Sequence, residues 1–394
     1  MQPLDRSAAL AIAPLWRLGF RPFFLFGALF ALLAVALWGA ALAGLAVPQP
    51  LGGLLAWHRH EMLFGFGLAI IAGFLLTAVQ TWTSLPSLSG RPLMALFGLW
   101  LVGRLAWFLP LSPALLALLE LAFAVALLLA FGRLILRARQ RHNAPIVLVI
   151  GLLGACQALT LYGLVEGDDA LQRRSTLAAL WLVAALMSII GGRVIPFFTA
   201  RGLGLANQAA ARPWLMWGLL GLSLTAALLF AAGLNQRPTP LLAAPFLLLA
   251  VLHGMRLWHW HDAGIWRVPL LWSLHLAYAW LVVAALGMAA WHLGWLAQPS
   301  LASHALAVGA MGGLILAMLA RVSLGHTGRA LLPPRAMAWA FALLQGAALA
   351  RVLLAAGSVQ GLWLAAALWC LAFALFLRHY APMLWSARVD GHPG

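Results

Sequence analysis

Residues 57–83 read WHRHEMLFGFGLAIIAGFLLTAVQTWT, and this stretch decides the fold. Its apolar part, 62–83, would extend about 33 Å as a helix, enough to cross the ~30 Å hydrocarbon core of a bilayer. Similar stretches recur along the 394-residue chain, which is 64% hydrophobic and only 8% charged. The sequence therefore predicts an all-α polytopic membrane protein with about twelve transmembrane helices. The expected spans are 22–46, 62–83, 93–110, 112–132, 144–165, 175–195, 213–234, 239–257, 268–291, 300–321, 335–356 and 359–380.

The basic residues give the chain an orientation. All 24 are arginines, and most of them lie in alternate gaps between the spans. An excess of arginine marks cytoplasmic loops, so both termini are expected in the cytoplasm. Because the arginines are spread over short loops rather than gathered on a polar domain, they indicate contact with a lipid bilayer and no nucleic-acid partner. The arginines expected on the opposite side are Arg59, Arg104, Arg173, Arg174, Arg237 and Arg351.

The chain contains a weak internal repeat. His60 and Gly65 align with His304 and Gly309 at one fixed offset, and a second offset aligns Arg193 with Arg321. Self-similarity at fixed spacing is typical of repeated structural modules. We therefore expect a single integral membrane domain over residues 1–394. It would contain three four-helix modules at 15–142, 143–264 and 265–385.

The histidines fall into two layers, one near each membrane surface. A polar group without a partner in an apolar helix costs on the order of several kcal/mol, so histidines within spans need a partner or a metal. On the outer side, His60 and His304, with Glu61 beside His60, predict an open catalytic metal site. On the inner side, His253 and His275 lie at similar depths on adjacent helices, as the two axial ligands of one haem would. Further candidate metal ligands are His58, His259, His261 and His326; a place in the aromatic belt of the interface is the alternative for the first three.

Four arginines near or within the spans have two interpretations each. Arg193 and Arg321 close two spans at equivalent inner positions. A guanidinium group fits carboxylates, so these two arginines are candidate partners of haem propionates, with snorkelling to the membrane surface as the alternative. Arg104 and Arg351 lie within spans, where an interior ion pair or a propionate contact is expected.

Other residue patterns narrow the function. The glycines of GFGLAIIAGF (from Gly65) and GAMGGLI (from Gly309) predict either close helix packing or room for a flat cofactor. Cys156 and Cys370 lie in apolar stretches without CxxC spacing, so neither a structural disulfide nor a c-type haem is expected. Eight acids in the whole chain are few for a proton pump that relays protons through carboxylates.

Several motifs resemble those of the NnrS family. They are WHRHEMLFGFG from Trp57, GGRVIPFFTARG from Gly191 and SHALAVGAMGGLILAMLARVSLGHTGRAL from Ser303, and the similarity extends over essentially the whole chain. The resemblance implies a twelve-helix protein of the bacterial cytoplasmic (inner) membrane that contains haem and copper. It also implies a link to denitrification and to nitric oxide resistance. The residues that match the family's motifs are His58, His60, Glu61, Arg193, Arg201, His304, Arg321, His326 and Arg329.

These observations favour a haem-dependent enzyme that reduces nitric oxide to nitrous oxide. One or two haem b groups are expected, with copper or non-haem iron as a second metal, because a second metal beside an open haem brings two nitric oxide molecules together. Quinol is the expected electron donor, since the chain has no soluble docking domain. Two alternatives stay open: a haem protein that binds or senses nitric oxide without turnover, and a transporter of a metal or metal–nitrosyl species.

Overall fold

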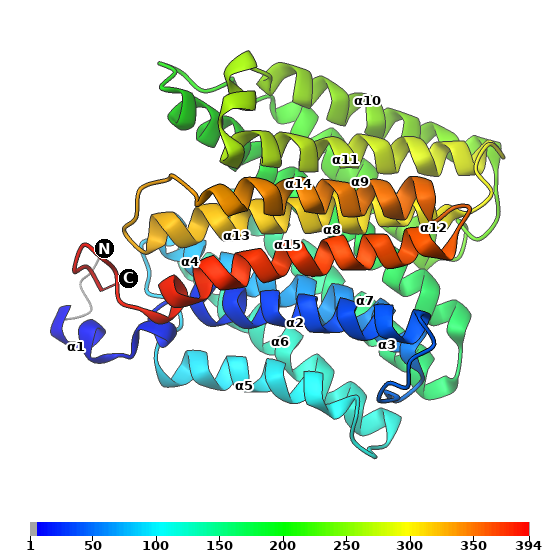
Figure 1. Cartoon of the computed structure of the whole chain (residues 1–394), viewed down its shortest axis with the longest axis horizontal. Coiled ribbons are helices and arrows are strands. Elements are labelled where there is room, and N and C mark those ends of the chain that lie inside the picture. The colour runs from blue at the N-terminus through cyan, green and yellow to red at the C-terminus, as the bar shows by residue number, and fades with distance from the viewer. Residues whose placement is uncertain (1–5, 394) are drawn as a thin grey trace. The chain divides into compact units, whose positions relative to one another are not determined.

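The computed structural model describes residues 6–393, and over this range the chain forms helices and no β-strand. The all-α prediction is therefore confirmed. The first half of the chain begins with the short helix α1 (Arg6–Ala11) (Figure 1). The helix α2 (Phe20–Leu42) follows and is the first of the long apolar helices. The elements that follow are α3 (Leu54–His60), the π-helical η2 (Glu61–Gly67), α4 (Leu68–Thr83), α5 (Arg91–Ala106), α6 (Pro113–Arg137), α7 (Ala144–Glu166) and α8 (Asp169–Leu203).

The second half continues as helices joined by short turns. Prolines begin several of these helices, where a missing N–H costs no intrahelical bond. The elements are α9 (Pro213–Ala231), α10 (Ala243–Trp260), α11 (Pro269–His292), α12 (Pro299–His304), the π-helical η6 (Ala305–Gly312), α13 (Gly313–His326), α14 (Arg335–Leu349), the π-helical η7 (Ala350–Leu354) and α15 (Val359–Trp385); short 3-10 turns lie at Pro14–Trp16, Arg141–Asn143, Pro240–Leu242 and Ala263–Arg267.

Among the described residues, 11 helical segments are long and apolar enough to cross a membrane. They correspond to all of the predicted spans except the third, predicted at 93–110. That span is α5, which has 16 residues and extends about 24 Å. It ends early because Pro110 disfavours the helical conformation of the residue before it, Leu109. The chain is thus a multi-pass membrane protein, with α5 shorter than expected.

The chain divides into two compact units that are not continuous in sequence. Unit 1 comprises Met1–Thr176, Leu319–Leu332 and Phe373–Gly394, and unit 2 comprises Leu177–Met318 and Pro333–Ala372. This division crosses the boundaries of the three predicted modules, so the modules stay a prediction.

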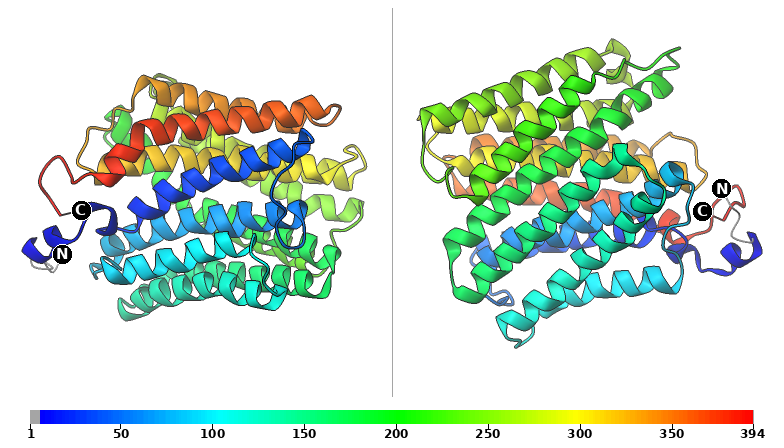
Figure 2. Two further views of the ribbon diagram at one scale, coloured as in Figure 1. Left: turned by 60° about the horizontal axis from the view of Figure 1, so that its bottom comes forward. Right: turned by 180° about the vertical axis from the view of Figure 1, so that it is seen from behind.

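The core of unit 1 is formed by aromatic and aliphatic side chains of its long helices. One cluster joins α2, α4, α5 and α6 through residues that include Phe23, Leu76 and Trp100. Gly73 on α4 permits the close approach of α2, because a Cβ there would lie 3.0 Å from the ring of Phe24. Both ends of the described chain lie together at one end of this unit (Figure 2), where Arg17 Nη1 donates to the carbonyl of Pro393 at 3.4 Å.

Unit 2 packs large aromatic rings against glycines. A Cβ on Gly309 would lie 2.3 Å from Cγ of Trp280, and a Cβ on Gly312 would lie 2.5 Å from the ring of Trp369. The Trp280 indole N–H donates to Gln345 Oε1 at 2.7 Å, which fixes the ring. Of the two interpretations of the GAMGGLI glycines, close packing is therefore the one these contacts support.

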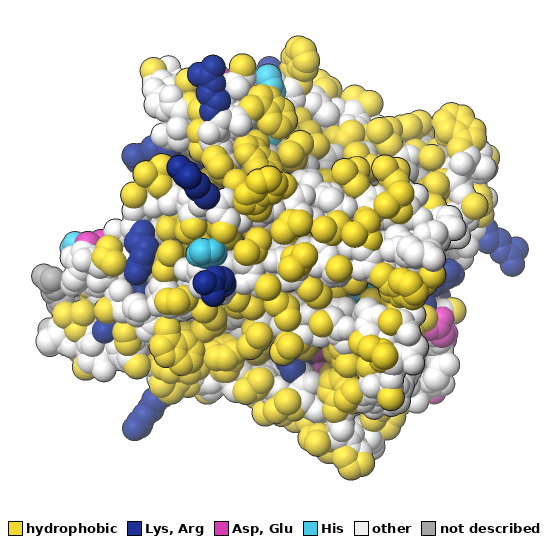
Figure 3. Space-filling view, viewed as in Figure 1, with side chains coloured by type: hydrophobic (Ala, Val, Ile, Leu, Met, Phe, Trp, Pro, Cys, Tyr) yellow, Lys and Arg dark blue, Asp and Glu magenta, His cyan; other side chains and the backbone are white. Residues whose placement is uncertain are grey.

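The outer surface has the composition of a membrane protein. The face seen in Figure 3 is mainly hydrophobic, and the arginines visible on it lie mostly near the ends of helices. Exposed large side chains such as Leu118 and Leu129 project from within α6, and Leu228 projects from the last turn of α9. In water such exposure would be unfavourable, whereas lipid tails accept it.

Candidate metal centre

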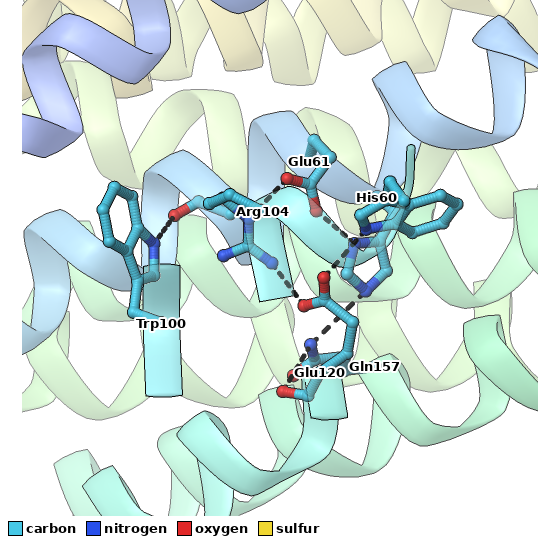
Figure 4. A network of polar contacts seen from close by, with 8 residues as sticks. His60, Glu61, Trp100, Arg104, Glu120 and Gln157 are labelled. Atoms are coloured by element: carbon cyan, nitrogen blue, oxygen red, sulfur yellow. Dashed lines mark hydrogen bonds and ion pairs between the residues drawn. The ribbon is translucent and has the colours of Figure 1, made fainter. Parts of the chain in front are cut away.

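A buried group of three metal-binding side chains lies inside unit 1. His60 ends α3, Glu61 begins η2, and Glu120 lies in α6; one ligand atom from each falls within 4.8 Å of the others (Figure 4). All three side chains are almost completely buried. Among the described residues this is the one group of at least three such side chains close enough to hold a metal ion.

The π-helical turn after His60 shapes the site. His60 Nδ1 and Glu61 Oε1 are 2.9 Å apart, so two consecutive side chains point to the same centre. Gly65 makes room for the carboxylate, because a Cβ there would lie 2.8 Å from Glu61 Oε2. The Trp100 indole N–H donates to the Gly65 carbonyl at 2.8 Å, which satisfies a backbone group of the widened turn. Single π-helical turns within α-helices often occur at functional sites.

Arg104 of α5 joins the two carboxylates. Its Nε lies 2.5 Å from Glu61 Oε2, and its Nη2 pairs with Glu120 Oε2. The guanidinium also lies over the rings of Phe30 and Trp100, at 5.7 and 5.8 Å from their centroids. The interior ion pair expected for Arg104 is therefore present, and a planar guanidinium suits this bridging role.

Two neutral side chains complete the hydrogen bonding. The Trp107 indole N–H donates to Glu120 Oε1 at 2.8 Å. The Gln157 amide in α7 lies 3.3 Å from His60 Nε2 and donates to the backbone carbonyl of Glu120 at 3.4 Å. This pattern assigns the proton of the neutral His60 ring to Nδ1, which donates to Glu61, and leaves the Nε2 lone pair as the acceptor. A metal held by His60 would replace the present hydrogen bond at the ring nitrogen it binds, either Nδ1 with Glu61 or Nε2 with Gln157.

The site carries an excess of negative charge. Two carboxylates face one guanidinium, and the imidazole is neutral in the hydrogen-bonding pattern above. A buried charge without compensation is unfavourable, so the group is suited to bind a cation or a proton. One imidazole and two carboxylates form a nitrogen and oxygen ligand set, which fits non-haem iron or Cu(II) better than Cu(I), since Cu(I) prefers sulfur.

Glu120 is the member of the site that the sequence analysis missed. It is the one acid within the predicted spans, and a charged residue inside a span predicts a functional site. The histidines and arginines near the spans do not indicate Glu120, because it is distant from them in the sequence. His60 and Glu61 are brought together as expected.

The other outer-layer candidates have separate surroundings. His58 stacks on Trp38, with ring centroids 4.4 Å apart, and its role as a metal ligand stays a prediction. His304 Nδ1 lies 2.7 Å from the Ser300 carbonyl, one turn earlier on α12. His304 precedes the π-helical η6 as His60 precedes η2, a likeness that the predicted repeat would produce. Because His304 belongs to unit 2, a common centre with His60 stays a prediction.

The two deep histidines of unit 2 have different partners. His253 Nδ1 lies 3.0 Å from the Tyr278 hydroxyl, which also accepts from Arg256 at 3.2 Å. His275 Nδ1 donates to the Leu271 carbonyl at 3.0 Å, while its Nε2 is buried near the Trp260 backbone and makes no hydrogen bond of good geometry. A histidine that ligates a metal through Nε2 commonly donates its other N–H to a carbonyl, so His275 fits a haem ligand. The pairing of His253 with His275 on one haem stays a prediction.

The remaining candidates lie near helix ends. His259 is partly exposed and contacts Arg212 and the Ala210 carbonyl, and His261 follows the end of α10. His326 ends α13, with its ring 5.5 Å from that of Phe20. Arg193 is half-buried in unit 2 and Arg321 is buried in unit 1; their predicted roles as propionate partners are untested.

The fold and the site define a class: a polytopic helical membrane protein with a buried histidine and carboxylate centre. Comparison with known protein families identifies one family. A family model described as NnrS protein matches residues 14–388, nearly the whole chain. The chain therefore belongs to the NnrS family, and membership indicates a membrane protein of the nitric oxide response. A search of curated proteins gave no significant match.

Proposed function

We propose that this chain detoxifies nitric oxide in the cytoplasmic membrane by reducing it to nitrous oxide. The observation that carries the proposal is the buried group of His60, Glu61 and Glu120, because its ligand set fits a redox-active metal within the membrane. Nitric oxide is small and apolar, so it dissolves in the bilayer and reaches a buried site without a large channel.

The reaction sets what the protein must supply. Two nitric oxide molecules, two electrons and two protons give one nitrous oxide and one water. One quinol releases two electrons and two protons, so a lipid-soluble quinol balances the reaction without a soluble partner. A bound redox metal would pass on the electrons and hold the substrate.

Each residue of the site has a proposed role. His60 through Nε2 and the carboxylates of Glu61 and Glu120 hold copper or non-haem iron. Since the group carries one more negative than positive charge, the carboxylates also accept and release the protons of the reaction. Arg104 and Trp107 keep both carboxylates in place, and the hydrophobic surroundings exclude water.

We also propose that the chain binds haem b, with His275 as an axial ligand. The support is the burial of His275 within unit 2 together with the hydrogen bond from Nδ1 to Leu271. A second axial ligand would give a low-spin haem for electron entry, and His253 is the candidate. Absorption spectra of the purified chain count the haem groups, of which we expect one or two.

The test uses the full chain purified in detergent. Metal content is measured by mass spectrometry, haem by absorption spectra, and nitrous oxide by gas chromatography after anaerobic addition of nitric oxide and a short-chain quinol. We expect the His60→Gln and Glu120→Gln variants to lose at least about tenfold of their non-haem metal and of their nitrous oxide production. Glu166→Gln is the matched control, because Glu166 is an exposed acid at the end of α7.

The outcomes separate the candidate functions. Nitrous oxide formed over many turnovers by the wild type, and lost in both site variants but not in the control, supports the reductase. A stable nitrosyl spectrum without nitrous oxide replaces it with binding or sensing. Wild-type protein that contains neither haem nor a non-haem metal contradicts the proposal and leaves transport as the function to test.

A further inference from the structure

A cluster of arginines gathers at the end of unit 1 where the two chain termini meet. Arg21 lies in the first turn of α2, and Arg17, Arg329 and Arg388 are near enough for their charges to act on it. The side chains come from the start of α2, the turn after α13 and the tail after α15. This cluster has no place in the metal centre or in the proposed reaction.

Arg21 is the centre of the cluster and is completely buried. Its Nη1 donates to the carbonyls of Leu384 at 3.0 Å and Ser386 at 2.6 Å, which lie at and just beyond the C-terminal end of α15. Its Nε and Nη2 are buried and have no hydrogen-bond partner. Buried guanidinium N–H groups are almost always paired, so these two donors indicate a missing acceptor.

Arg329 supplies a further donor. Gly328, with φ +75°, ends α13 in the left-handed conformation that favours glycine, and the Arg329 N–H then donates to the Leu324 carbonyl at 3.0 Å. This turn fixes the backbone of Arg329. Its Nη1 is also buried without a partner.

The acid that the structure describes in this cluster is already occupied. Asp390 accepts from Arg388 through both carboxylate oxygens, from Nε at 2.9 Å and from Nη2 at 2.5 Å. The hydrogen bond from Arg388 holds the pKa of Asp390 well below its usual range, so the carboxylate stays ionised and paired. The charges of Arg21 and Arg329 are therefore left for an external anion.

From this geometry we infer that the cluster is a binding site for a phosphate group, either of an anionic lipid headgroup or of free phosphate. The orphaned Nε and Nη2 of Arg21 form the fork that binds two oxygens of one phosphate, and Arg329 adds a third donor. The site lies where α2 begins, on the arginine-rich side of the membrane, which is the level of lipid headgroups.

The test compares ligands on the full chain in detergent. The midpoint of thermal unfolding is measured with phosphatidylglycerol, with phosphatidylcholine of the same acyl chains, and with inorganic phosphate. We expect phosphatidylglycerol to raise the midpoint of the wild type more than phosphatidylcholine does. If inorganic phosphate alone gives an equal shift with the same dependence on variants, the site is real and its ligand is free phosphate.

The variants decide whether the cluster is responsible. Arg329→Gln should weaken the apparent affinity for phosphatidylglycerol at least about tenfold. Arg21→Lys keeps a charge and a donor for the end of α15 but lacks the fork, and we expect the same loss. Arg137→Gln removes an equal charge from an exposed position at the end of α6 and should behave as the wild type.

Two results would overturn the inference. One is an equal phosphatidylglycerol shift in the wild type and in the Arg329→Gln and Arg137→Gln variants. The other is a wild type that neither phosphatidylglycerol nor phosphate stabilises. If Arg21→Lys does not fold, the comparison of the other two variants still decides, because the hydrogen bonds described at the end of α15 come from Arg21 and are kept in both.

Discussion

At the scale of single residues, Arg104 links the two carboxylates of the metal centre. It is the one cation between Glu61 and Glu120 in the site as described, and all three side chains are buried. Removing one member of a buried ion pair leaves an uncompensated charge, which costs far more than the net stability of the pair. Arg104 therefore acts as a structural cation that keeps two carboxylates close together before any metal binds.

We predict that Arg104→Met lowers the free energy of unfolding by about 3–5 kcal/mol, because two carboxylates lose their shared partner. Thermal and denaturant unfolding in detergent measure the change. The double variant with Glu120→Gln should recover part of the stability, since it removes one of the stranded charges.

The control for Arg104→Met is Arg59→Met, which breaks the ion pair with Asp169, whose side chain is 70% exposed. An exposed pair contributes about 0–1 kcal/mol, so this variant should unfold nearly as the wild type does. Equal losses from both arginine substitutions would contradict the role assigned to Arg104.

Part of the site was predictable from single residues. His60 and Glu61 are polar residues at the mouth of an apolar span, which is unfavourable without a partner and therefore conspicuous. The partnership of Glu120, Arg104 and Gln157 was not predictable, because three helices bring them together and the spacing of an apolar helix does not indicate which face meets which neighbour.

At the scale of helices, unit 2 depends on glycines that admit tryptophan rings. We predict that Gly309→Ala lowers the free energy of unfolding by about 1–3 kcal/mol, because a Cβ would lie 2.3 Å from Cγ of Trp280. Gly254→Ala in α10 is the matched control: its Cβ would meet nothing within 4 Å, so the change should be neutral or stabilising.

Unfolding of the two glycine variants in the same detergent checks the prediction. A destabilised Gly254→Ala variant beside an unchanged Gly309→Ala variant would mean that Trp280 does not pack as described. The helices themselves were predictable from apolar length. The π-helical turns were not, because hydrophobic periodicity in a uniformly apolar segment does not distinguish 3.6 residues per turn from a locally wider turn.

At the scale of the whole chain, the arginine bias predicts the side on which the termini lie. In unit 1 both ends of the described chain meet, so the number of crossings between them is even. Eleven strong spans would be odd, so we expect α5 to supply the remaining crossing despite its 16 residues. The division into two units that interleave along the sequence was not predictable, since composition is uniform across their boundaries.

We predict that reporters fused before the N-terminus and after residue 394 both report a cytoplasmic location. A fluorescent protein and a periplasmic phosphatase, each fused at both ends, make the measurement. Opposite locations of the two ends would rule out α5 as a crossing, and a periplasmic location of both would invert the two histidine layers.

The π-helical turn after His60 lies between α3 and α4 and sets the rotation of one helix relative to the other. Each residue of an α-helix rotates the next by about 100°. The wider turn over Glu61–Gly67 changes this rotation per residue locally. The direction in which His60 and Glu61 point is therefore independent of the face that α4 presents to its neighbours. Because a π-helical turn holds about one residue more than an α-helical turn, loss of one residue here would leave Gly73 facing Phe24. It would instead close the widened turn that aims His60 and Glu61 at one centre, a change of which the hydropathy of the span gives no sign.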